Sequence, residues 1–206
     1  MSELFSELCG NLDVPANTLP SPDEISYYTL EKDRKIYLEG DIGQDTMVLE
    51  RMILRWNMED KGIPVSERKP IRIYIMSYGG DLDYMWSAID AIQLSVTPIV
   101  TVDMGVAASA AALIFLAGHE RWMLPNAKVI IHEGSAQMAG DAVKVMDATD
   151  SYRKELKRMK EYILDRTEIP KTMMNKKRNN DWTLDSAYCL ETKVTHKIVR
   201  SLNDII

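Results

Sequence analysis

Hydrophobic and polar residues follow two repeating patterns, which alternate along the chain. Short apolar or alternating runs, which are typical of strands, occupy residues 35–39, 71–76, 98–102, 121–124 and 128–131. Elsewhere apolar residues recur at steps of three and four, and helices are expected at residues 46–58, 82–94 and 106–116. Strands that alternate with helices are joined by crossovers and form a mostly parallel sheet. The pattern therefore predicts an α/β fold.

The longest amphipathic segment is expected to be a helix over residues 140–166. Its apolar side chains fall on one stripe, and its other faces are charged. The stripe consists of Val145, Tyr152, Leu156, Met159 and Ile163. Such a stripe packs either on its own domain or on a partner, and the pattern does not decide between the two.

The first 22 residues differ from the rest because Pro15, Pro20 and Pro22 interrupt any period. We expect a flexible lead-in over residues 1–22 and one domain over residues 23–206. The apolar residues of the lead-in have helical spacing, so both a packed terminus and a docking or gating segment remain open.

Composition limits the classes of function. The chain has 206 residues, 46% hydrophobic and 27% charged, which is typical of a soluble globular domain large enough for an enzyme. Its net charge of -6 disfavours a nucleic-acid partner. The longest stretch without a charge, residues 104–118, is 15 residues long and shorter than the roughly 20 that span a bilayer. We therefore expect a buried helix there and no membrane association.

The cysteines and histidines indicate a compartment and disfavour a metal. Only Cys9 and Cys189 occur, and the N-terminal residues lack the basic flank and apolar core of a secretory signal, which together indicate the cytoplasm. Histidines, cysteines and acidic residues do not cluster at metal-ligand spacing, so no metal site is expected.

Ser109 stands alone among small residues, between Met104 and Ala112. If a helix begins there, the Ser109 hydroxyl lies in the positive field of the helix N-terminus, beside the free N–H of Ala110. A nucleophile and an oxyanion donor would then be adjacent. Ser109 is equally explained as the N-cap of an alanine-rich helix. Its surroundings do not match the Gly-x-Ser-x-Gly elbow, which disfavours an α/β-hydrolase.

Three further features are ambiguous when each is taken alone. Gly79 and Gly80 follow a strand and either turn backbone N–H groups toward an anion or form a tight turn. His132 ends an apolar strand, where it is either structural or part of a site. Asp181 precedes Trp182 and reads as a loop carboxylate or a helix cap.

In combination these residues resemble the caseinolytic protease proteolytic subunits, the ClpP family, from about Lys35 to Ile198. The matching segments are residues 71–80, 104–109, 113–118, 121–127, 129–132 and 181–184. His132 follows Ser109 by 23 positions and precedes Asp181 by 49, and both intervals are similar to those of the family.

The resemblance implies a fold and a set of roles. The fold is ClpP/crotonase-like, with stacked βαβ units and a protruding long helix, or handle. The resemblance implies that Ser109 is the nucleophile, His132 the general base and Asp181 the residue that orients the imidazole. It assigns the oxyanion hole to the N–H groups of Gly80 and Ala110, and the substrate-binding edge to Gly79, Asp81, Leu82, Glu133 and Gly134.

The resemblance also implies an assembly. Proteolysis of peptides or unfolded proteins would be confined to a homo-oligomeric chamber built of heptameric rings, single or stacked as a double ring. An AAA+ unfoldase would control access, and no cofactor is implied. Tyr74, on a strand expected to be peripheral, matches a position that helps form a docking pocket for the unfoldase, although it is also explained as an ordinary strand aromatic.

Several departures mark a divergent member and keep alternatives open. Tyr78 stands where the family usually has proline, Glu133 and Gly134 replace a usual Gln-Pro, and Asn179 and Asn180 replace a usual Asp-Arg. A phage-type relative, including a head-maturation protease, fits such divergence. A catalytically silent scaffold or regulatory subunit is the alternative from another class. A crotonase acting on acyl-CoA thioesters is disfavoured because no carboxylate pair stands out in the small-residue segment.

Overall fold

The computed structural model describes residues 21–134, 137–177 and 181–206. Contacts divide the chain into two units, one that ends at Asp33 and one that covers Arg34–Ile206. The described part of the first unit is helix α2 (Pro22–Lys32), which begins with a reciprocal capping box between Ser21 and Glu24. Residues 1–20 of the expected lead-in lie outside the described residues, and the expected boundary after residue 22 stays a prediction.

The second unit is built on a seven-stranded sheet. Its strands are β1 (Lys35–Ile42), β2 (Ile71–Gly80), β3 (Ile99–Ala108), β4 (Glu120–Met123), β5 (Lys128–Ile131), β6 (Trp182–Asp185) and β7 (Lys197–Ile198). The order is β1-β2-β3-β4-β7, and β5 pairs with both β3 and β6. Every described pair is parallel except β5 with β6. The predicted α/β fold is confirmed.

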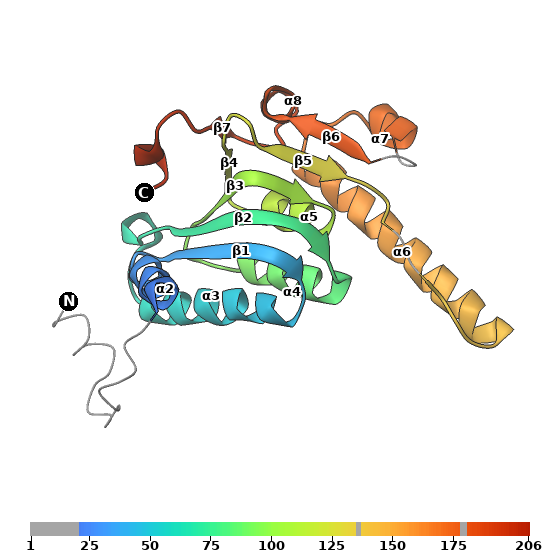
Figure 1. Cartoon of the computed structure of the whole chain (residues 1–206), viewed down its shortest axis with the longest axis horizontal. Coiled ribbons are helices and arrows are strands. Elements are labelled where there is room, and N and C mark those ends of the chain that lie inside the picture. Colours follow the sequence, from blue (N-terminus) through green and yellow to red (C-terminus); the bar gives the residue numbers. More distant parts are fainter. Residues whose placement is uncertain (1–20, 135–136, 178–180) are drawn as a thin grey trace. The chain divides into compact units, whose positions relative to one another are not determined.

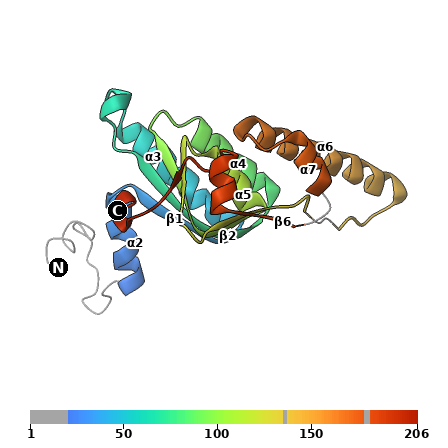
Figure 2. The ribbon, with the colours of Figure 1, turned by 90° about the horizontal axis from the view of Figure 1, so that it is seen from above.

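Six α-helices accompany this sheet in the described part of the second unit. They are α3 (Met47–Glu59), α4 (Leu82–Gln93), α5 (Ala110–Ala117), α6 (Ala142–Arg166), α7 (Lys171–Lys177) and α8 (Ser186–Glu191). Short 3-10 turns lie at Gln44–Thr46, Val65–Glu67 and Leu202–Asp204. Figure 1 shows α3, α4 and α5 along the same side of the sheet. In both views α6 extends beyond the sheet, as expected for a protruding helix (Figures 1 and 2).

The core lies between the sheet and helices α3, α4 and α5. Alternate residues of β2, among them Ile71, Ile73 and Ile75, point into it and are fully buried, together with Trp56 of α3 and Phe115 of α5. Every residue of α5 is buried. The segment that begins at the serine is therefore packed on all sides.

The expected helix at residues 106–116 is wrong at its start. Strand β3 continues to Ala108, and α5 begins only at Ala110. Residues 106–108 have strand partners because β5 pairs with them and Ser77 of β2 lies opposite Ala107. Small residues carry no apolar period, so the pattern did not show where the strand ends. The same correction applies to the charge-free stretch 104–118, which is a strand followed by a helix.

Strand β2 is interior, whereas the sequence predicted a peripheral strand. It pairs with β1 on one side and with β3 on the other. The Tyr74 side chain is 4% exposed and its hydroxyl donates to the backbone oxygen of Ile205. Tyr74 therefore packs as a strand aromatic in a second cluster with Val100, Val102 and Val199.

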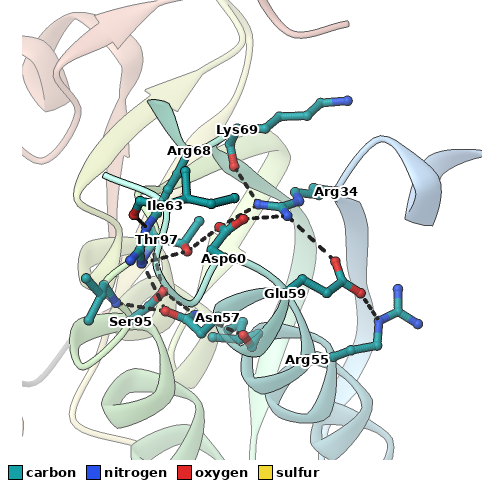
Figure 3. Close-up of polar contacts among 12 residues, drawn as sticks. Arg34, Arg55, Asn57, Glu59, Asp60, Ile63, Arg68, Lys69, Ser95 and Thr97 are labelled. Atoms are coloured by element: carbon teal, nitrogen blue, oxygen red, sulfur yellow. Dashed lines mark hydrogen bonds and ion pairs between the residues drawn. The ribbon is translucent and has the colours of Figure 1, made fainter. Parts of the chain in front are cut away.

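A buried polar network joins the end of α3 to the residues that precede β1 and β3 (Figure 3). The carboxylate of Asp60 is 1% exposed and accepts two hydrogen bonds of 2.7 Å from Arg34 and one of 2.6 Å from Thr97. The amide oxygen of Asn57 accepts from the N–H groups of Val96 and Thr97. The hydrogen bonds from Arg34 lower the pKa of Asp60. The network fixes the amino ends of β1 and β3, and β3 leads into Ser109 at its other end.

Candidate active site

Ser109 is the single residue between β3 and α5, and its backbone is strained. Its φ is 53° and its ψ is -123°, a conformation that costs a non-glycine residue about 1–3 kcal/mol. The Ser109 N–H donates to the oxygen of Ile130 at 2.9 Å, and its carbonyl accepts from Ala112 at 3.0 Å. The chain thus turns sharply from strand to helix at the serine. This is the geometry of a nucleophile elbow, reached without the Gly-x-Ser-x-Gly pattern.

Gly79 makes the room that the elbow needs. It has a φ of 107°, and a Cβ at this position would lie 2.7 Å from the Cβ of Ser109 and 3.0 Å from the nitrogen of Ala110. Gly80 faces β1 instead, where a Cβ would lie 2.3 Å from the oxygen of Ile42. Close approach of neighbouring backbones therefore requires both glycines. In the Gly-x-Ser-x-Gly pattern the room around the serine comes from glycines beside it in the sequence. Here it comes from Gly79 on the adjacent strand β2.

The antiparallel pair β5–β6 brings His132 and Asp181 together. Ile131 lies opposite Trp182 in the register, so the next residue of β5 faces the one that precedes β6. Nδ1 of His132 lies 3.6 Å from Oδ1 of Asp181. The imidazole is 33% exposed and the carboxylate is 79% exposed. The two side chains are therefore neighbours within ion-pair distance, without a hydrogen bond between them.

Ser109 and His132 line one cleft of about 530 Å³. Four of the five predicted substrate-binding residues line it as well, namely Gly79, Leu82, Glu133 and Gly134, together with Gly80. The rest of the cleft lining was not predicted from the sequence. It consists of Asp41, Ile42, Tyr78, Leu113, Tyr152, Met159 and Ile163. No hydrogen bond joins Ser109 to His132 among the described residues.

Three predicted site residues do not line the cleft. Asp81 is at the N-cap of α4, where its carboxylate accepts from the N–H groups of Asp83 and Tyr84, and its place at the substrate edge stays a prediction. Its carboxylate caps the N-terminus of this helix. Ala110 is 1% exposed and lies at the first turn of α5. Asp181 contacts the imidazole rather than the cleft.

The predicted apolar stripe of α6 turns its second half toward its own domain. Ile163 belongs to the core, and Leu156 and Met159 line a small pocket with Trp182 beside His132. Of the two packings that the pattern left open, these three residues take the one on their own domain. On the first half of α6, Val143 and Met146 are each 67% exposed.

No group of three metal-ligating residues occurs in the described ranges. Burial raises the pKa of the Cys189 thiol to about 12, so this residue is an unreactive part of the core. Cys9 lies outside the described residues. None of the described helices is both long and apolar enough to cross a bilayer.

Comparison with known proteins identifies a family for this chain. A family model described as Clp protease matches residues 23–201, which include Ser109, His132 and Asp181. A protein of Treponema pallidum named ATP-dependent Clp protease proteolytic subunit 2 is 28% identical over 187 residues, which cover 90% of this chain and 92% of the relative. Proteins of the same name from Treponema denticola and Borreliella burgdorferi are each 30% identical, over 178 and 174 residues. These two matches cover 84% and 82% of this chain and 84% of each relative.

Proposed function

The chain belongs to the Clp protease family, and on that premise we propose that it is a serine peptidase that uses Ser109, His132 and Asp181. One observation carries the proposal. A serine is held at a strained strand-to-helix turn in the same cleft as a histidine, and a carboxylate oxygen of Asp181 lies 3.6 Å from Nδ1 of that histidine. Strain of this kind is maintained where a site needs it.

Each group has a defined role in the proposed reaction. The Ser109 hydroxyl attacks the peptide carbonyl, His132 takes its proton and then gives it to the leaving amine, and Asp181 holds the imidazole in the required tautomer. The N–H groups of Gly80 and Ala110 stabilise the oxyanion, and donors of this kind contribute about 3–4 kcal/mol each. Water then releases the acyl group by the same proton transfers in reverse order.

The proposed substrate is a peptide or an unfolded protein in extended form. The cleft runs between the end of β2 and the segment after His132, and Leu82, Leu113 and Met159 give it apolar walls. An extended chain placed there pairs with the backbone of these two edges, as in strand addition.

We further propose a homo-oligomeric chamber built of heptameric rings, with an AAA+ unfoldase that controls entry. The relatives are named proteolytic subunits of an ATP-dependent protease, which supports both an assembly and an ATPase partner. The described helix α6 extends beyond the sheet and exposes Val143 and Met146, which suits contact with another copy. The proposed location is the cytoplasm.

A catalytically silent subunit is the second candidate. It is favoured by the missing hydrogen bond between Ser109 and His132 in the described chain and by the 79% exposure of the Asp181 carboxylate. A silent subunit has no chemical need for a strained serine, so we rank it second.

Hydrolysis of a fluorogenic peptide by the purified full chain separates the two candidates. We expect turnover by the wild type and none by Ser109→Ala, which removes only the hydroxyl and keeps the fold. Equal rates for the two proteins, or no turnover by either, would remove the peptidase proposal.

A further inference from the structure

The backbone that follows His132 leaves the sheet and enters the cleft. Strand β5 ends at Ile131, and the residues that follow His132, Glu133 and Gly134, line the cleft together with Ser109. Neither of their N–H groups has a backbone partner among the described residues. A segment without a ladder needs another restraint to keep one conformation.

Tyr152 supplies such a restraint from helix α6. Its hydroxyl donates to the backbone oxygen of Glu133 at 3.0 Å. The phenol also lines the cleft. Burial raises its pKa and the nearby Glu133 carboxylate raises it further, so the hydroxyl keeps its proton and can donate at neutral pH.

Gly134 is shaped to this contact. Its φ is 77°, and a Cβ at this position would lie 3.0 Å from the hydroxyl oxygen of Tyr152. A side chain at this residue would therefore both strain the backbone and press on the phenol. One helix turn earlier along α6, Thr149 contacts Met138 of the same segment. Two positions of α6 thus contact described residues that follow His132, namely Glu133 and Met138.

We propose that Tyr152 is a positioning residue for peptide binding, because its hydroxyl fixes the Glu133–Gly134 edge on which the substrate lies. The inference rests on the proposed peptidase function and deepens it. Tyr152 has no hydrogen bond to Ser109 or His132 among the described residues, so it acts on the binding edge and leaves the reacting groups alone. Through this bond α6 sets the affinity for the peptide chain, and the reactivity of Ser109 does not depend on it.

Tyr152→Phe tests the role, with Tyr162→Phe as the matched control. The control removes a hydroxyl from the same helix, one that accepts from Gln93 at 3.2 Å. For Tyr152→Phe we expect the KM for a fluorogenic peptide to rise about fivefold, the effect of one lost hydrogen bond, with kcat within about twofold. The rate of labelling by a small fluorophosphonate should not change, since that reagent does not use the peptide edge.

Gly134→Ala gives a second, independent variant. The added methyl group should raise KM more in the wild-type background than in the Tyr152→Phe background, because the clash with the hydroxyl exists only in the former. The strain at φ 77° is common to both and cancels.

Two results would overturn the inference while the peptidase proposal stands. One is a KM for Tyr152→Phe equal to that of Tyr162→Phe. The other is an equal loss of peptide hydrolysis and of labelling, which would mean general damage to the site. A wild type that neither cleaves peptide nor becomes labelled would overturn the peptidase proposal itself. Thermal unfolding of each variant checks that it is folded.

Discussion

At the scale of single residues, the conformation of Ser109 links stability to function. Serine at φ 53° is tolerated because Ile130 and Ala112 hold its backbone and Gly79 leaves room for it. Glycine adopts this conformation without the cost that a Cβ brings. The free energy of this backbone strain can therefore be measured in inactive variants, separately from catalysis.

We predict that Ser109→Gly is more stable than Ser109→Ala by about 1 kcal/mol, although both are inactive. Alanine keeps the strain and loses only the hydroxyl, whereas glycine relieves the strain at some entropic cost in the unfolded chain. Urea unfolding of the two variants gives the difference. An alanine variant as stable as the glycine variant would show that the turn is not strained.

Asp103 is a buried carboxyl group inside β3. It is 0% exposed, its Oδ1 accepts from the N–H of Gly105, and its Oδ2 has no partner among the described residues. Burial raises the pKa of Asp103 to about 7, against 3.8 in the unfolded chain. Between these values the folded state holds a proton that the unfolded state has lost. The stability that this group contributes is thus present below about pH 4 and is lost as the pH rises to about 7.

Asp103→Asn should remove this pH dependence, because the amide does not titrate. From pH 5 to pH 8 we expect the wild type to lose about 3 kcal/mol of unfolding free energy relative to the variant. Urea unfolding at both pH values measures the change. The nearby Cys189 stays neutral in this range because its pKa is raised to about 12. A constant difference between the two proteins would mean that Asp103 is already ionised at pH 5.

At the scale of elements, periodic segments could be predicted from the sequence and junctions could not. The strand at residues 128–131 and the long helix were predicted because bulky apolar residues mark their faces. The junction at Ser109 was misplaced because alanines fit a strand and a helix equally well. Asp181 could be found only by resemblance. Its place beside His132 depends on the antiparallel register of β6, a four-residue strand that no pattern marks.

The network that joins α3 to the starts of β1 and β3 is an element-scale support of the fold (Figure 3). Asp60→Asn should destabilise the protein by about 3 kcal/mol, because it removes the buried carboxylate that pairs with Arg34 and leaves this cation only the exposed Glu59 as a described ion-pair partner. Glu59→Gln is the control, since this carboxylate is 49% exposed and contributes about 0–1 kcal/mol. Chemical denaturation compares the two. Equal losses of unfolding free energy in the two variants would show that the buried Arg34–Asp60 pair does not stabilise the fold.

At the scale of the whole molecule, the proposed assembly depends on the exposed part of α6. Leu156, Met159 and Ile163 already pack on their own domain, so changes there would also damage the cleft. Val143 and Met146 are each 67% exposed and are the appropriate positions to change.

Val143→Glu combined with Met146→Lys should dissociate the proposed oligomer into smaller, folded species. Burying charges in an apolar contact is unfavourable, whereas both side chains are harmless in solvent. Analytical ultracentrifugation decides the outcome, with Asp147→Asn on the same part of α6 as the control. A wild type that sediments as a monomer at micromolar concentration would refute the assembly.

The central claim is that Ser109 is a nucleophile activated by His132. Its most direct test is intact-mass spectrometry after treatment with a fluorophosphonate, followed by peptide mapping of the adduct. We predict one phosphonyl group per chain, on the peptide that contains Ser109, and none in His132→Ala. An unmodified wild type, or an adduct on another serine, would contradict the account.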